Sequence, residues 1–199
     1  MGASDDFDAA VLSEQERNLR HYNIEYQRRA DGTLVVPGYI DLSYKNLTVL
    51  PNFSGVIVEG DFFCYNNQLT SLEGAPAFVG RRCGVSNNRL TTLKGAPESV
   101  GEDFWCTGNY RLTSLEHCPK YIGNTLGCQE NPALENLEHA PRTFKQIQSP
   151  FGDFKSWGEV PDHLAPETKA RYTDDLIRES TILQAPVAIS APLHLRRRA

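Results

Sequence analysis

The feature that most constrains this sequence is a leucine pair, LxxL, which recurs along the middle of the chain at a nearly constant spacing. The pairs are Leu47/Leu50, Leu69/Leu72, Leu90/Leu93, Leu112/Leu115 and Leu134/Leu137. Successive pairs are 22, 21, 22 and 22 residues apart. Self-similarity at such a period is the signature of a repeat architecture, in which each repeat adds one coil to a stack.

Other residue types keep the same register as the leucines. An apolar residue follows the second leucine at plus seven in every repeat, at Ile57, Val79, Val100, Ile122 and Phe144. Proline follows at plus four in all repeats but the first, at Pro76, Pro97, Pro119 and Pro141. Asparagine precedes the first leucine at Asn67, Asn88, Asn109 and Asn131. This agreement predicts a solenoid of five coils over residues 39–145.

A single coil is too small to bury its own apolar side, so leucine stacked on leucine must form one continuous core. The expected interior adds alternate residues of a short strand in each coil: Phe62/Cys64, Cys83/Val85, Phe104/Cys106 and Leu126/Cys128. We expect the asparagine amide to bond backbone groups at the bend. Proline and the neighbouring glycine favour an irregular return segment. The coils are therefore predicted to be flat, with strands on one side.

The coils read FFCYNNQLTSLEGAP, CGVSNNRLTTLKGAP, FWCTGNYRLTSLEHCP and LGCQENPALENLEHAP. This pattern resembles the leucine-rich repeats, above all the short variety with FxCxxNxLTSLEGAP words found in phage and bacterial proteins. The longer repeats have further consensus leucines and a helical convex segment, which these coils lack. The resemblance covers about half of the chain. It implies an α+β repeat fold, a short leucine-rich-repeat-like β-solenoid of about five coils with helical N- and C-terminal caps.

Residues 1–38 are predicted to cap the first coil with a helix and a hairpin-like element. Ser13 and Glu16 form a capping-box pattern that predicts a helix through about Arg28. Three apolar or aromatic residues are expected on one face of it: Leu19, Tyr22 and Tyr26. Asp31-Gly32 is a turn signal that leads into the apolar residues 34–36.

Residues 146–199 are predicted to cap the last coil. Four apolar residues in a Gly/Pro-broken segment are expected to fold over it: Phe151, Phe154, Trp157 and Val160. Pro166 is expected to begin a helix to about Gln184, with one stripe of Tyr172, Leu176 and Leu183. The tail from Ala185 contains two prolines and a basic cluster at its end, and we expect it to be extended or mobile.

Strand alternation sends every second side chain away from the core. The outward rows are Asp61, Phe63, Tyr65; Arg82, Gly84, Ser86; Asp103, Trp105, Thr107; and Thr125, Gly127, Gln129. These positions vary between coils while the interior ones do not, and large exposed aromatic residues are favoured binding anchors. The predicted partner-binding residues are Phe63, Tyr65, Arg82, Asp103, Trp105, Thr107 and Gln129. The alternatives are that a cap folds over the aromatic residues or that they stack only on one another.

Other chemistry is weakly supported. The five cysteines contain no CxxC pair, and their place in the repeat predicts small buried hydrophobes in a reducing compartment. His117 and His139 share one coil position, but a metal site needs three or four converging ligands. The column of Glu73, Lys94, Glu116 and Glu138 is expected to be a solvated edge. We therefore expect no catalytic residues, no metal and no cofactor.

The net charge of −5 disfavours a nucleic-acid partner, because such binding needs a basic face. No apolar run is long enough to span a membrane, and the acidic first eight residues do not resemble a signal peptide, so we expect a cytoplasmic protein. The short repeats also resemble those of secreted bacterial ubiquitin ligases, whose catalytic domain uses a cysteine. No cysteine follows Lys145, so that activity is not expected here.

The sequence thus favours a non-enzymatic module for protein–protein interaction that binds another protein, from a host or a phage. The resemblance implies a phage- or bacterium-encoded inhibitor or adaptor acting on a host protein, including in counter-defence. Two alternatives stay open: a structural or accessory component of a phage particle, and the recognition arm of a small enzyme whose activity lies in the C-terminal segment. The oligomeric state is not determined by these residues.

Overall fold

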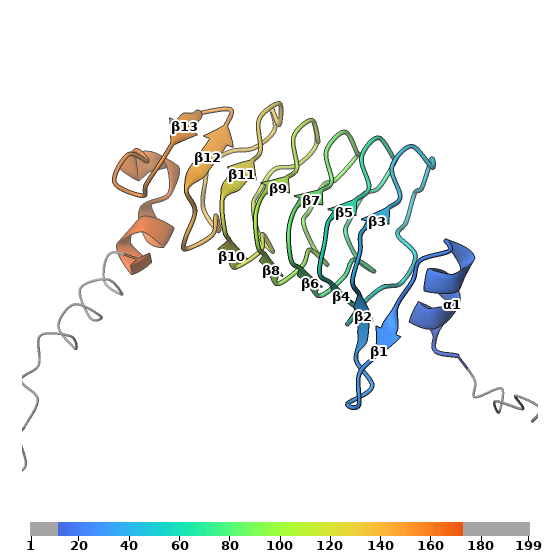
Figure 1. Ribbon diagram of the computed structural model, residues 1–199. Helices are drawn as coiled ribbons and strands as arrows, with labels where there is room; N and C mark the ends of the chain where they lie inside the picture. The colour runs from blue at the N-terminus through green and yellow to red at the C-terminus, as the bar shows by residue number, and fades with distance from the viewer. Residues whose placement is uncertain (1–11, 173–199) are drawn as a thin grey trace, which may run out of the picture.

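The coils stack side by side into a β-solenoid, as the repeat predicts (Figure 1). The structure is a computed structural model, and it describes residues 12–172. The stack contains two sheets, one of six and one of seven strands. Small helical elements lie at its two ends (Figure 1). No helix within residues 12–172 is long and apolar enough to cross a membrane.

The seven-stranded sheet contains the strands that the sequence predicts. Its members are β3 (Ile40–Asp41), β5 (Phe62–Phe63), β7 (Cys83–Gly84), β9 (Phe104–Trp105), β11 (Thr125–Gly127), β12 (Gln146–Ser149) and β13 (Gly152–Phe154). Neighbours from β3 to β12 pair in parallel, and β13 folds back antiparallel on β12. The expected interior residues of this sheet, from Phe62 to Cys128, are all fully buried. The prediction of the strand-side core is therefore confirmed.

A second sheet forms on the return side of the coils, where the sequence predicts irregular chain. Its members are β1 (Gln27–Arg28), β2 (Leu34–Val36), β4 (Ile57–Val58), β6 (Phe78–Val79), β8 (Ser99–Val100) and β10 (Tyr121–Ile122). The prediction of strands on one side only is wrong. A segment of two residues that follows the proline is extended and in register with the same segment of the next coil. Two such residues in each coil are enough to form a short parallel ladder.

One residue of the predicted core points the other way. Ile57 is half-buried and pairs with the exposed Phe78, while Val58 is fully buried and pairs with Val79. The first coil has one residue more between its second leucine and this strand than the later coils have. Because side chains alternate along a strand, that single residue exchanges the inward and outward positions.

The recurrent asparagines form a buried ladder along the stack. Asn88 donates from Nδ2 to the carbonyl oxygens of Cys64 (2.9 Å) and Val85 (3.0 Å), and its Oδ1 accepts from the Leu69 amide (3.1 Å). Asn67, Asn109 and Asn131 make equivalent bonds to the coils beside them. The predicted bonding of the bend is confirmed, and it also joins successive coils.

A column of glycines, overlooked at the sequence level, lets the coils approach at the bend between the two sheets. Its members are Gly60, Gly80, Gly101 and Gly123. A Cβ on Gly101 would lie 2.0 Å from the carbonyl oxygen of Gly80, a distance that no side chain tolerates. The signal is present in the sequence, since these glycines also recur once per coil.

The N-terminal helix α1 (Glu14–His21) has the predicted capping box but ends well before Arg28. The Asn23 amide donates to the Arg20 carbonyl (3.0 Å) and the Ile24 amide to that of Leu19 (2.8 Å), which is a Schellman ending. Asn23 has a positive φ of 53°, a conformation that asparagine tolerates well. Arg28 instead belongs to β1, which forms the expected hairpin with β2.

Glu16 joins the N-terminal helix to this hairpin. Its side chain is almost fully buried and lies 2.6 Å from the guanidinium of Arg28. The hydrogen bond from Arg28 and the amide of Ser13 lower the pKa of Glu16 to about 2. Tyr22 and Tyr26 pack against the core from beyond the end of the helix, whereas Leu19 does so from within it.

The C-terminal segment covers the last coil, as predicted. Phe154 and Val160 are buried, and Phe151 and Trp157 pack against the core. A short 3-10 helix, η1 (Asp162–Leu164), precedes a helix over residues 166–172. Leu176, Leu183, the predicted end of this helix and the basic tail lie outside the described residues.

Glu138 departs from the expectation of a solvated edge, because it caps that helix. Its carboxylate accepts from the amides of Glu167 (2.9 Å) and Thr168 (3.0 Å). Burial opposes ionisation, but these bonds and the Thr168 hydroxyl together lower the pKa of Glu138. Glu73 and Lys94, earlier in the same column, form the expected exposed ion pair at 2.8 Å.

Candidate functional site

The outward side of the seven-stranded sheet, here called the strand face, carries three rows of side chains that cross successive coils. The middle row consists of Asp41, Phe63, Gly84, Trp105, Gly127, Gln148 and Asp153. The row before it consists of Asp61, Arg82, Asp103, Thr125 and Gln146, and the row after it of Ser43, Tyr65, Ser86, Thr107 and Gln129. All seven predicted partner-binding residues therefore lie on one continuous surface.

The predicted residues are half-buried rather than freely solvent-facing. Phe63, Tyr65, Arg82, Asp103, Trp105, Thr107 and Gln129 all have intermediate exposure. For Tyr65 and Trp105 the reason is visible at the two glycines of the middle row, which their rings overlie. A Cβ on Gly84 would lie 2.0 Å from Tyr65 Cζ, and one on Gly127 would lie 2.6 Å from Trp105 Cδ1. This close approach to the sheet accounts for the partial burial of the two rings.

In the first half of the face, formed by the second and third coils, aromatic and charged groups bind one another. Phe63 stacks on Tyr65 with 5.2 Å between ring centroids. Arg82 bonds Asp61 through two contacts, Nε to Oδ1 at 3.1 Å and Nη2 to Oδ2 at 2.9 Å. The guanidinium carbon of Arg82 also lies 5.7 Å from the centre of the Phe63 ring, a cation–π distance.

These contacts change the ionisation of the groups involved. Burial opposes ionisation of Asp61, but the side-chain and backbone hydrogen bonds from Arg82 outweigh it and lower the pKa of that carboxyl. Burial raises the pKa of the Tyr65 phenol. Of the two alternatives, stacking of the aromatic residues on one another occurs for Phe63 and Tyr65, and both rings keep intermediate exposure within residues 12–172.

In the second half of the face, formed by the fourth and fifth coils, polar ladders replace the ion pair. Asp103 Oδ1 accepts from the Asn124 side chain (2.7 Å) and from the Thr125 amide (3.1 Å). The Thr107 hydroxyl donates to Gln129 (3.2 Å), and Gln129 donates to Gln148 (3.0 Å). These bonds hold the polar side chains in place around Trp105.

Five residues of the face were missed by the sequence reasoning: Asp41, Ser43, Gln146, Gln148 and Asp153. The first two precede the first aromatic coil, and the other three lie after the last leucine pair, where the repeat motif gives no register. Alternation around the buried Ile147 would have placed Gln148 outside. Asp153 reaches the face only because β13 folds back on β12, which no local pattern shows.

The charge of the strand face is negative. Its three rows contain four carboxylates, Asp41, Asp61, Asp103 and Asp153, and a single cation, Arg82, which Asp61 already binds. One carboxylate oxygen of Asp41 accepts a hydrogen bond from the amide of Ser43 at 2.9 Å. The three rows therefore offer carboxylates to a partner, and their cation is already paired, while the exposed Lys155 directly follows β13.

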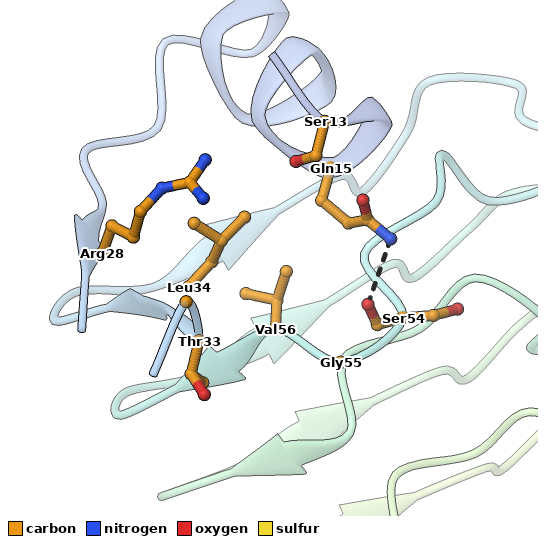
Figure 2. A pocket seen from close by; sticks show the side chains of 9 residues that line it. Ser13, Gln15, Arg28, Thr33, Leu34, Ser54, Gly55 and Val56 are labelled. Carbon is orange, nitrogen blue, oxygen red and sulfur yellow. Dashed lines mark hydrogen bonds between the residues drawn. The ribbon is translucent and has the colours of Figure 1, made fainter. Parts of the chain in front are cut away.

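Cavities elsewhere are small or open. Figure 2 shows one of about 200 Å³ between α1, the β1–β2 hairpin and the first coil, lined by Arg28, Thr33 and Val56 among others. Gln15 closes one side of it by donating to the carbonyl of Ser54 (3.3 Å). This volume is below that of usual small-molecule sites, and Arg28 is already paired with Glu16.

The remaining candidate ligands do not converge. Within residues 12–172, no three His, Cys, Asp or Glu side chains are placed to hold a metal ion. His117 and His139 are exposed and adopt positive φ angles of 68° and 67°, in the column where earlier coils have glycine. All five cysteines are free and buried, and burial raises the pKa of every thiol, to about 12 for Cys128.

Comparisons with protein-family models, with curated proteins and with solved structures found no match to this chain.

Proposed function

We propose that this protein is a non-enzymatic interaction module that binds another protein on its strand face. The observation that carries the proposal is the middle row, in which Phe63 and Trp105 alternate with glycines on a rigid sheet. The Phe63 ring is held by contacts with the Tyr65 ring and the guanidinium of Arg82, and Trp105 lies over Gly127. Aromatic residues held in this way are favoured anchors, because little side-chain entropy remains to be lost on binding.

The frame beneath the face supports this role. The asparagine ladder and the uniform core hold the strands in register, so the outward residues can vary without altering the fold. The described part of the C-terminal segment is engaged in capping the last coil. With the likeness of the repeats to those of phage and bacterial proteins, we propose an inhibitor or adaptor that acts on a host protein.

Affinity capture from a bacterial lysate, read by mass spectrometry, tests the proposal. The wild-type protein is compared with the double variant Phe63→Ala/Trp105→Ala. We expect one or more proteins to be captured by the wild type and lost, by about tenfold or more, from the double variant. Tyr110→Ala is the matched control, because Tyr110 is an aromatic residue with 63% exposure that lies outside the strand face.

Thermal unfolding of each variant shows whether the fold is intact. A double variant that folds and captures the same proteins in the same amounts as the wild type would remove the strand face as the binding surface. Capture that is lost equally in Tyr110→Ala would place the binding surface on another side of the solenoid.

A further inference from the structure

The strand face contains the same pair of residue types twice, two coils apart. Asp61 and Phe63 in the second coil correspond in register to Asp103 and Trp105 in the fourth. Both aspartates are oriented in the same way, because Oδ1 accepts from the backbone amide of the next coil: Arg82 at 3.0 Å in one case and Thr125 at 3.1 Å in the other. The two coils therefore place an equivalent acid–aromatic pair on the strand face.

The two pairs differ in what the following coil supplies. In the third coil Arg82 bonds both oxygens of Asp61 and covers the Phe63 ring. In the fifth coil Thr125 stands at the position of Arg82, and it is too short to reach in the same way. The first pair thus binds an arginine of the same chain through its carboxylate and its ring. The second pair has the same carboxylate and an aromatic ring, but the chain supplies no arginine at that position.

The second pair also keeps polar atoms that no protein group uses. Asn124 and the Thr125 amide both bond Oδ1 of Asp103, and within residues 12–172 no donor contacts its Oδ2. Trp105 Nε1 has no acceptor in that part of the chain, whereas Trp157 Nε1 donates to the Arg142 carbonyl at 3.1 Å. No buried side-chain polar atom in the described residues lacks a partner, so both atoms are open to solvent.

We propose that Asp103 and Trp105 form a binding site for an arginine side chain of the partner protein. This inference rests on the proposed function and specifies its chemistry. The guanidinium would pair with Asp103 Oδ2 and lie over the indole, as Arg82 does on Asp61 and Phe63. A planar guanidinium satisfies both contacts at once, which a lysine ammonium does not. The negative charge of the face favours a cationic partner further.

A peptide titration followed by NMR tests the site directly. The probe is the blocked tripeptide acetyl-Gly-Arg-Gly-amide, and the signal is the indole ¹H–¹⁵N resonance of Trp105 in the full chain. Only two tryptophans are present, and the engaged indole of Trp157 serves as the internal reference. We expect the Trp105 resonance to move in a saturable way while that of Trp157 stays fixed. The peptides with citrulline or lysine in place of arginine should bind about tenfold more weakly or not at all.

Two variants locate the arginine. Asp103→Asn preserves the shape of the side chain and should weaken the arginine peptide about tenfold or more. Thr125→Arg supplies the missing side chain from within the chain, so it should shift the Trp105 resonance before any peptide is added and abolish the response to it. Thr125→Gln, which is long but uncharged, is the matched control and should retain the response.

The outcomes separate this inference from the proposed function. An unmoved Trp105 resonance, equal binding of the citrulline or lysine peptide, or an unchanged response in Asp103→Asn or Thr125→Arg would each overturn the arginine site. In that case loss of captured proteins from Phe63→Ala/Trp105→Ala would still support a protein-binding face. A double variant that keeps its captured proteins would overturn the proposed function, whatever the peptide does.

Discussion

The first and second halves of the strand face place an aspartate and an aromatic residue in the same register, but they differ in what these two residues contact. In the first half, the charge of Asp61 and the ring of Phe63 are both engaged by Arg82. In the second half, Asp103 accepts from Asn124 and Thr125, and Trp105 lies over Gly127, with no cation on either among residues 12–172. The backbone registers are the same, so the difference arises from side chains: arginine or threonine beside the aspartate, and Tyr65 or Thr107 two residues after the aromatic ring. A few substitutions in a repeat protein can thus turn an internally satisfied surface into one open to a partner.

The comparison teaches where variation is tolerated in this fold. The interior and the asparagine ladder are nearly the same in both halves, because each coil must match its neighbours on both sides. The outward rows meet water or one another, and their residues change from coil to coil. Substitutions in the interior or the asparagine ladder should therefore reduce stability more than substitutions that make one half of the strand face resemble the other.

The largest effect is expected for Asn88→Ala, which breaks the frame on which both halves rest. The change leaves the carbonyl oxygens of Cys64 and Val85 and the amide of Leu69 without their buried partner. We expect the free energy of unfolding to fall by about 3 kcal/mol or more, measured by urea denaturation. Asn87→Gly is the control, because the adjacent Asn87 is exposed and has a positive φ of 55° that glycine adopts freely. A loss in Asn87→Gly as large as that in Asn88→Ala would contradict the ladder as the source of stability.

A smaller effect is expected for Arg82→Thr, which makes the first half resemble the second. Asp61, whose side chain is 12% exposed in the intact pair, loses its ion pair, and the Phe63 ring loses its cover. We expect a loss of about 1–2 kcal/mol in the free energy of unfolding, reduced from that of a buried pair because Arg82 is partly solvated. Arg81→Thr breaks the exposed pair with Glu102 and should change stability by about 0.5 kcal/mol or less. Equal losses in the two variants would show that the Arg82–Asp61 pair contributes no more to the free energy of unfolding than the exposed Arg81–Glu102 pair.

The smallest effect is the pH dependence of that difference. The pKa of Asp61 is lowered in the folded state, so the pair contributes fully above the pKa of an unfolded aspartate, 3.8, and its contribution is lost as the pH falls through the lower folded value. The gap in unfolding free energy between the wild type and Arg82→Thr should therefore be constant near neutral pH and shrink below about pH 4. Denaturation curves at several pH values measure it. A gap that widens on acidification would contradict this origin of the stability.

Much of the fold could be predicted from the sequence because each coil repeats its neighbour. The leucines, the alternating strand residues and Asn67, Asn88, Asn109 and Asn131 all lie where their spacing places them. The return-side sheet was missed although it repeats in every coil, because two extended residues per coil give no alternation to read. Other errors arose where the repeat provides no neighbour to copy or where one residue changes the register. The end of α1 at His21, the exchange of Ile57 with Val58 and the capping role of Glu138 are of this kind.

The sequence by itself determined the solenoid, its core and the identity of the outward rows, because periodic burial depends only on spacing and on the alternation of side chains. Only the tertiary structure decided which outward groups are satisfied. Asp61 and Arg82 are 21 positions apart and bond through the stacking of coils, as do Asp103 and Asn124. The strand that brings Asp153 to the face is likewise a product of folding back at the last coil. Contacts between coils depend on distances of a few ångström that local spacing does not specify, and these distances separate the engaged half of the face from the open one.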